Sequence, residues 1–415
     1  MLSPFVAYIT LGIAKMDFNS TFTVFTYFGV FLILIYGNKS NPIKFPKYLL
    51  FYLLFILYVY HSAFYQLDKE FKIAYLYKNL LIGSFNLLFI IENLSINKKY
   101  YEFLFKLNKK VLIIAVLVII IQQAYNVNFF IREDMVDENA SVSSNVERLH
   151  SIYSWVGSIA NGLGFVPVFL LVVEDLNKRK QSKKVLFWIL LGIVYSLLTK
   201  SRWIMVNTLM VFIVILITHE DKFKEFLKYL VVIPFILLLS YFALNSIGVN
   251  AEGIIMDRVL EKGKKNINQK SAGTRLLAIQ VFNKLYWKNA IFGKGNIKYG
   301  MGGTGRQDYA LKKALAGKSS QLHVGYLSLF YMYGAVGGSL FLIFLFFFLK
   351  KIYQNSKKTS HWAPFLGLLG FAVANLTLVA FSIFELGLIF AVIADKYFIE
   401  KKNFNLMLKY NGENI

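Results

Sequence analysis

The chain has 415 residues, of which 57% are hydrophobic and 17% aromatic, with a formal net charge of +23 and a mean hydropathy of +0.52. A composition this apolar exceeds what a water-soluble core of this length needs, so we expect a polytopic membrane protein and no nucleic-acid partner. The absence of cysteine excludes disulfides and thiol-ligated metal sites.

Twelve apolar runs are candidates to cross about 30 Å of hydrocarbon, which takes roughly 20 apolar residues and fewer where the ends reach the interface. They lie near 2–15, 21–37, 48–65, 73–92, 111–131, 152–173, 185–199, 203–218, 229–247, 324–349, 363–380 and 384–398. The sequence therefore predicts an all-α membrane protein of about 12 transmembrane helices: nine in 1–247, a large external and partly helical loop in 248–323, and three more with a tail in 324–415. The N-terminal segment has no basic n-region and no small-residue cleavage site, so we expect no removable signal peptide.

Lys and Arg are divided unevenly between alternate connections. The set 38–47, 93–110, 174–184, 219–228, 350–361 and 396–415 holds 24 of them, whereas the set 16–20, 66–72, 132–150 and 200–202 holds six. Basic residues accumulate in short cytoplasmic connections. This pattern predicts that both termini are cytoplasmic and that the loop 248–323 is external.

The external loop is strongly basic, with fourteen Lys and Arg against four acids between Gly248 and Leu322. Three readings fit such a charge: an ordinary solvated surface, attraction to anionic lipid headgroups, or a site for an anionic substrate such as a phosphate. Charge alone does not choose among them.

Spacing within the loop is more informative. Between Gly273 and Trp287 apolar residues fall at 276, 279, 282 and 286, which predicts an amphipathic helix against the membrane face with Arg275 in its first turn. Two glycine-rich pieces follow, at 291–295 and 299–305, where glycine permits close backbone approach and unusual dihedral angles. Neither piece follows a strand of a βαβ unit, which argues against a dinucleotide or Walker site.

The order of these features resembles the O-antigen ligase and polymerase superfamily, which includes capsule and exopolysaccharide polymerases. The features are Ser201-Arg202 at the outer start of a span, Gly-Thr-Arg275, Ile-Phe-Gly-Lys-Gly295, and His323 at the head of the next span. The ligase pattern is His, then Asn, Ser or Gln, nine residues, and Gly-x-x-Gly. Here Val324 occupies the second position, while Gly334-Ala-Val-Gly337 has the matching spacing. The resemblance covers about residues 195–340.

The resemblance implies a membrane-embedded glycosyltransferase that acts on undecaprenyl-pyrophosphate-linked glycans at the outer face of a bacterial cytoplasmic (inner) membrane. By this resemblance Arg202 and Arg275 hold the pyrophosphate, and His323 acts near the attacked sugar carbon or the acceptor hydroxyl. Arginine offers a fork of donors suited to phosphate oxygens, and histidine can accept a proton near neutral pH. The expected substrate-binding residues are Lys200, Arg258, Lys294, Gly293, Gly295 and Arg306.

No metal and no other cofactor is expected, because the acids of the loop are scattered and form no Asp-x-Asp pair. The expected partners are the lipid-linked oligosaccharide as donor and acceptor, the lipid bilayer, and the chain-length regulator and flippase of the same pathway. Each residue also has a plainer interpretation. Arg202 beside Lys200 suits a snorkelling side chain, His323 suits an interfacial residue, and the glycines suit close helix packing.

Three functions remain open. A polymerase of lipid-linked repeat units and an O-antigen ligase share the same expected site, and Val324 in place of a polar residue favours the polymerase. The third is a flippase or transporter of lipid-linked oligosaccharides. Transporters usually have two similar halves, and this sequence has instead one large loop placed late in the chain, which favours the enzyme.

Overall fold

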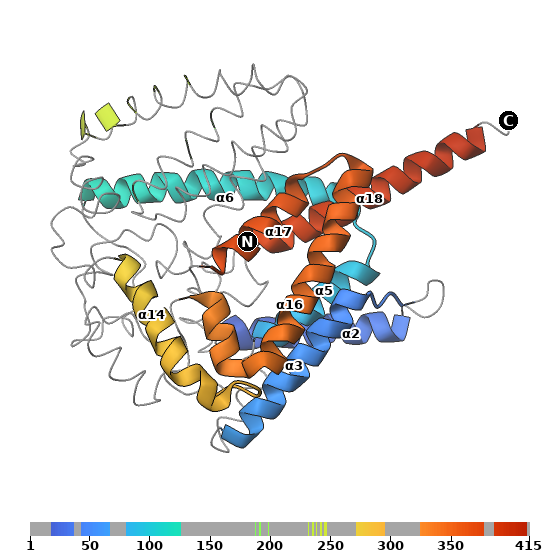
Figure 1. Ribbon diagram of the computed structural model, residues 1–415. Helices are drawn as coiled ribbons and strands as arrows, with labels where there is room; N and C mark the ends of the chain where they lie inside the picture. The colour runs from blue at the N-terminus through green and yellow to red at the C-terminus, as the bar shows by residue number, and fades with distance from the viewer. Residues whose placement is uncertain are drawn as a thin grey trace.

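The computed structural model describes residues 18–36, 43–66, 80–125, 271–294, 324–376 and 386–412, together with single positions between 187 and 246. These residues are helical, with no strand among them, so the all-α class is confirmed for this part of the chain. The helices, drawn in Figure 1, are α2 (Phe18–Tyr36), α3 (Lys47–Gln66), α5 (Leu80–Asn93), α6 (Lys98–Tyr125), α14 (Ser271–Leu285), the 3₁₀ helix η6 (Tyr286–Asn289), α16 (Gly325–Thr359), α17 (Ala363–Ala374) and α18 (Leu386–Gly412).

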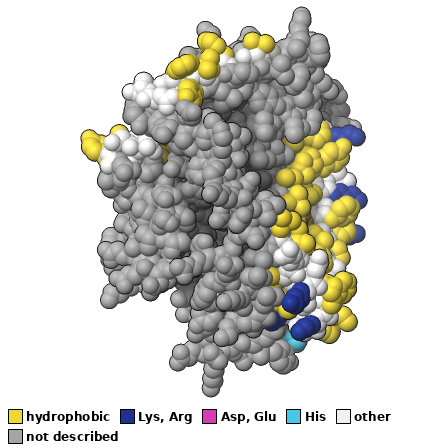
Figure 2. All heavy atoms as spheres, turned by 60° about the vertical axis from the view of Figure 1, so that its left-hand side comes forward, with side chains coloured by type: hydrophobic (Ala, Val, Ile, Leu, Met, Phe, Trp, Pro, Cys, Tyr) yellow, Lys and Arg dark blue, Asp and Glu magenta, His cyan; other side chains and the backbone are white. Residues whose placement is uncertain are grey.

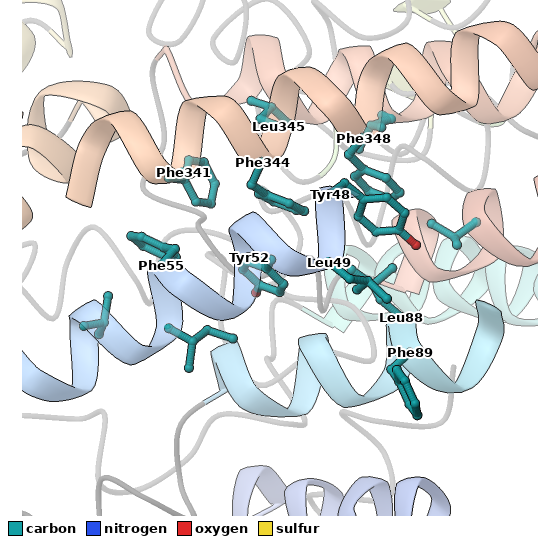
Figure 3. Close-up of a cluster of buried hydrophobic side chains, with 14 of the residues drawn as sticks. Tyr48, Leu49, Tyr52, Phe55, Leu88, Phe89, Phe341, Phe344, Leu345 and Phe348 are labelled. Carbon is teal, nitrogen blue, oxygen red and sulfur yellow. The ribbon is translucent and has the colours of Figure 1, made fainter. Parts of the chain in front are cut away.

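The core forms where α3 packs antiparallel on the long second part of α16. Tyr48 stacks on Phe348 with ring centroids 4.8 Å apart, and Phe55 meets Phe341 edge-on at 5.2 Å. Figure 3 shows this cluster, in which Leu88 of α5 joins the rings. Such aromatic pairs contribute about 0.5–1.5 kcal/mol each beyond the area that they bury. The contact therefore fixes α3 and α16 in one register along several turns.

Further helices pack around this core. Helix α2 runs parallel to α5, because Asn86 donates a hydrogen bond to Thr26 at 3.2 Å and Gly29 lies against Ile90 one turn further along both helices. The start of α6 packs on α18, where the rings of Tyr101 and Tyr397 stack at 4.2 Å. On the face that Figure 2 presents, described hydrophobic side chains form a strip with Lys and Arg side chains among them.

Several predicted spans coincide with described helices: 21–37 with α2, 48–65 with α3, 73–92 with α5, 111–131 with α6, 363–380 with α17 and 384–398 with α18. Two of these helices are longer than predicted. Helix α6 begins inside the connection 93–110, where Tyr101 stacks on Tyr397 of α18. Helix α18 continues through the tail to Gly412. The spans at 2–15, 152–173 and 203–218 lie outside the described residues, and those at 185–199 and 229–247 are described only at isolated positions.

Within the described residues, α16 is the helix long and apolar enough to cross a membrane by itself. Shorter apolar stretches occur in the first helices, at Thr26–Ile35, Lys47–Ser62, Ile82–Asn93 and Ile113–Tyr125.

Helix α16 corresponds to the span predicted over 324–349, but it is broken at Gly334 and is not one continuous helix. Tyr326 and Tyr353 are 27 residues apart, about 40 Å along a straight helix. Their partners lie much closer together: the Tyr326 amide donates to the carbonyl of Asn375, directly after α17, and Tyr353 packs on Phe365 of α17, ten residues earlier, or about 15 Å along a helix. The first half of α16 must therefore fold back along the second half, and Figure 1 shows the change of direction beside α14.

The glycines after the break allow the two halves to pack closely. A Cβ atom at Gly338 would lie 2.5 Å from the ring of Phe330, which belongs to the first half. A Cβ atom at Gly337 would lie 2.5 Å from Cβ of Tyr333 and 2.7 Å from the ring of Tyr58. Gly338 thus allows the two halves of α16 to pack closely, and Gly337 allows α3 to approach α16. Small residues have the same role in membrane helix packing.

At the far end of α16 the helices share a polar cluster, here called the basal cluster: Tyr48, Glu92, Lys351 and Lys396. The Glu92 carboxylate accepts hydrogen bonds from the Tyr48 hydroxyl at 2.7 Å and from the Lys351 ammonium. Lys396 donates to the backbone carbonyl of Glu92 at 2.8 Å. Each member lies in or next to a different segment that the charge pattern predicts to be cytoplasmic. The four segments, 38–47, 93–110, 350–361 and 396–415, therefore meet at one end of the helix group.

Candidate functional site

The loop after η6 is bound by its backbone to the break in α16. The hydrogen bonds that join the two segments are Ala335 N to Ala290 O at 2.7 Å, Val336 N to Ile291 O at 3.1 Å, and Lys294 N to Tyr331 O at 3.0 Å. A helix break leaves amides and carbonyls without intrahelical partners, and here the loop supplies them. We call this contact, residues 290–294 with 331–336, the clasp.

Two glycines face each other in the clasp. Gly293 has φ +76°, and Gly334 has φ +64° and ψ −169°, a region that is essentially restricted to glycine. A Cβ atom at Gly293 would lie 2.3 Å from the Gly334 nitrogen and 2.3 Å from the Met332 carbonyl oxygen. A Cβ atom at Gly334 would lie 2.2 Å from the Ile291 carbonyl oxygen. Both positions therefore require glycine for conformation and for space, and close backbone approach was predicted for the piece 291–295 that holds Gly293.

Side chains of neighbouring helices secure the remaining loop carbonyls. The Tyr58 hydroxyl of α3 donates to the Phe292 carbonyl at 2.7 Å, and the Tyr286 hydroxyl donates to the Ala290 carbonyl at 3.1 Å. Because the loop backbone faces the protein, its side chains point away from it: Ile291 is 60% exposed and Phe292 is 67% exposed. The clasp is thus a rigid junction of α3, α16 and the loop.

Helix α14, with η6 after it, covers the range 273–287 that the sequence predicts to be helical, and it packs on the protein through one face. Its buried residues are Ala278 and Val281, which cluster with Tyr331 of the first half of α16. Leu276 and Ile279 of the predicted stripe are exposed. Both faces of α14 therefore carry apolar residues, but only the face with Ala278 and Val281 is buried, because it packs on α16.

The electrostatic character of this region is entirely basic. Residues 271–294 contain four cations and no acid. The Lys294 ammonium lies 5.9 Å from the ring centroid of Tyr331. Burial lowers the pKa of Lys294, and the nearby charge of Lys288 lowers it further. Two cations held near each other without a carboxylate on their own segment form an attractive place for an anion.

Of the residues predicted for the site, the structure describes Arg275, Gly293 and Lys294. Gly293 and Lys294 lie in the clasp, and Arg275 lies on α14 four residues after the helix begins. Helix α16 begins at Gly325, two residues after His323. The other predicted residues lie outside the described part: His323, Arg202, Lys200, Arg258, Gly295 and Arg306. No group of three or more potential metal ligands occurs among the described residues.

Sequence reasoning missed one contributor to the clasp and one contact between the two halves of α16. Tyr58 reaches the loop from a helix more than two hundred residues earlier, and no local pattern distinguishes it from the other tyrosines of α3. Gly338 packs on Phe330, and the Gly337-Gly338 pair was a visible signal for close helix approach.

The chain was compared with protein-family models and with curated proteins. Neither comparison gave a match.

Proposed function

We propose that this protein is a polymerase that joins lipid-linked oligosaccharide repeat units into a cell-surface polysaccharide at the outer face of a bacterial cytoplasmic membrane. The observation that carries the proposal is the clasp. It joins Gly293 of the Ile-Phe-Gly-Lys-Gly segment to Gly334 of the Gly-x-x-Gly segment, although 41 residues separate them. Both segments are among the features that carry the resemblance to the O-antigen ligase and polymerase superfamily.

The proposal includes about twelve transmembrane helices with both termini in the cytoplasm. The arrangement of the described helices supports it, because the segments assigned to the cytoplasm meet at the basal cluster and the clasp lies away from that end. Seventeen residues separate Gly334 from Lys351, about 25 Å along the helix. With Lys351 at the cytoplasmic boundary of a hydrocarbon core of about 30 Å, the clasp lies close to the outer boundary.

In this arrangement the basic loop provides cations, and His323, the proposed general base, directly precedes α16 in the sequence. Arg275, Lys294 and Arg202 hold the diphosphate of the donor, and stabilise the charge that develops as it leaves. His323 accepts the proton of the acceptor hydroxyl. Protein cations fulfil the role that a divalent metal has in other glycosyltransferases, so the reaction is proposed to be metal-independent.

The test uses the purified full chain with a lipid-linked repeat unit and measures product length on a gel. The wild-type protein should lengthen the glycan in the presence of EDTA. General-base assistance typically contributes about 10²–10⁴-fold, so His323→Ala should be slower by that factor while folding normally. A wild-type protein that binds or moves the lipid but never extends the glycan is a transporter, and the enzyme proposal is then wrong.

A ligase is the second candidate, because the spacing from His323 to Gly334 equals that of the ligase pattern. The same preparation distinguishes the two when a lipid A–core acceptor replaces the second repeat unit. Transfer to that acceptor without chain extension identifies a ligase.

A further inference from the structure

An exposed apolar strip runs along α14, η6 and the loop of the clasp. Its members are Leu276, Ile279, Trp287, Ile291 and Phe292, with exposed fractions of 45%, 42%, 75%, 60% and 67%. On α14 the strip lies on the side of the helix away from Ala278 and Val281, which pack on α16. Large apolar side chains exposed together on one short segment mark a place where something other than water is bound.

The strip cannot fold inward to hide its side chains. The clasp and the Tyr58 hydroxyl hold the loop backbone against α16 and α3, which forces Ile291 and Phe292 outward. The buried residues of α14 fix the rotation of that helix in the same way. The strip is therefore a preformed surface.

Cations accompany the strip. Lys284 and Lys288 are exposed on the same segment, and no acid occurs from residue 271 to residue 294. The charge of Lys288 acts on Lys294, which is half-buried beside Tyr331. A second copy of this segment is a poor partner, because the contact would bring like charges together. The partner must offer apolar groups and anions side by side.

The position of the strip along the helices identifies such a partner. The clasp lies about 25 Å from Lys351 along α16, which places the strip at the outer boundary of a hydrocarbon core of about 30 Å. At this boundary tryptophan rings and lysine ammonium groups are favoured, because phosphate headgroups lie directly above acyl chains.

We propose that the strip docks the external loop on anionic phospholipid of the outer leaflet. Trp287, Ile291 and Phe292 enter the region between headgroups and acyl chains, and Lys284 and Lys288 contact the headgroup phosphates. The docked strip holds the clasp and Lys294 at headgroup level. This inference rests on the proposed membrane placement and is independent of the proposed reaction.

The absence of cysteine allows a direct test. Nitroxide labels are attached at Trp287→Cys and, in a second variant, at Ile279→Cys, in nanodiscs of phosphatidylglycerol with phosphatidylcholine. We expect both labels to collide more often with oxygen than with a water-soluble nickel complex. The controls are two other exposed aromatic positions, Phe346→Cys on α16, which should behave as lipid-exposed, and Phe404→Cys on the end of α18, which should behave as water-exposed.

The lysines are tested by Lys284→Gln with Lys288→Gln. A lysine near an anionic surface contributes about 1 kcal/mol, or roughly a fivefold preference. With both lysines present, the label at Trp287→Cys should therefore lie deeper in nanodiscs that contain phosphatidylglycerol than in nanodiscs of pure phosphatidylcholine. Adding Lys284→Gln and Lys288→Gln should remove this difference in depth.

The outcomes separate two kinds of failure. Water-exposed labels at 287 and 279 with a lipid-exposed label at 346 overturn the docking surface. Water-exposed labels at all three positions overturn the membrane placement as well. If the label at Trp287→Cys, with both lysines present, lies at the same depth with and without phosphatidylglycerol, the recognition of anionic headgroups is overturned.

Discussion

Substitution of Gly334 tests the clasp most directly. Gly334→Ala places a methyl group 2.2 Å from the Ile291 carbonyl oxygen and 2.4 Å from the Gly293 nitrogen, both of which belong to backbone that cannot rotate away. An alanine in this region of conformational space costs about 1–3 kcal/mol. The displaced loop would also lose the clasp hydrogen bonds, at about 0.5–1.5 kcal/mol each. We expect a total loss of about 3–6 kcal/mol in the free energy of unfolding.

The assay is thermal unfolding in detergent, followed by intrinsic fluorescence, together with protease cleavage of the loop as a local probe. Gly29→Ala is the matched control, because its new methyl group would meet only the terminal carbon of the flexible Ile90 side chain, at 2.7 Å. The control should unfold near the wild-type temperature, whereas Gly334→Ala should unfold well below it and expose the loop to protease.

A double-mutant cycle sharpens this test. Gly293→Ala disrupts the same contact from the other side. Once either substitution has separated the loop from α16, adding the other should lower the free energy of unfolding far less than it does in the wild-type protein. Additive effects of Gly293→Ala and Gly334→Ala, or a Gly334→Ala protein that unfolds like the control, would show that the two glycines do not act through one contact.

Three further predictions address the junction, the basal cluster and the site. Tyr58→Phe removes the hydrogen bond to the loop carbonyl and should lower the free energy of unfolding by about 1 kcal/mol in denaturant titrations, with the loop becoming easier to cleave. Glu92→Gln leaves Lys351 without its counter-charge and should cost about 1–3 kcal/mol by the same titration, because the lysine is partly exposed and recovers some hydration; Glu102→Gln, in an exposed pair with Lys98, should cost less than 0.5 kcal/mol. Arg275→Lys keeps the charge but loses the bidentate fork, so it should insert normally yet lose most polymerisation, and near-wild-type polymer would reduce Arg275 to a surface charge.

The sequence by itself determined the helical class and much of the helix placement. Apolar runs such as 48–65 correspond closely to α3, because a helix satisfies its backbone hydrogen bonds within one continuous segment and the length of the apolar run then limits its bounds. The sequence also singled out Gly293 as a position of close backbone approach, since glycine tolerates positive φ and has no Cβ atom, and it marked Gly334 for close helix packing.

Only the tertiary structure decided what these glycines do. Residues 324–349 read as one apolar span, and the break at Gly334 exists because carbonyls from a loop some forty residues earlier accept the amides that the helix loses. The same holds for α14, where apolar residues on both faces left open whether Ala278 or Leu276 would be buried, and contact with Tyr331 decided it. The pairing of Glu92 with Lys351 joins residues 259 apart, and no local pattern encodes such a contact, because it forms only when α3, α5 and α16 have packed.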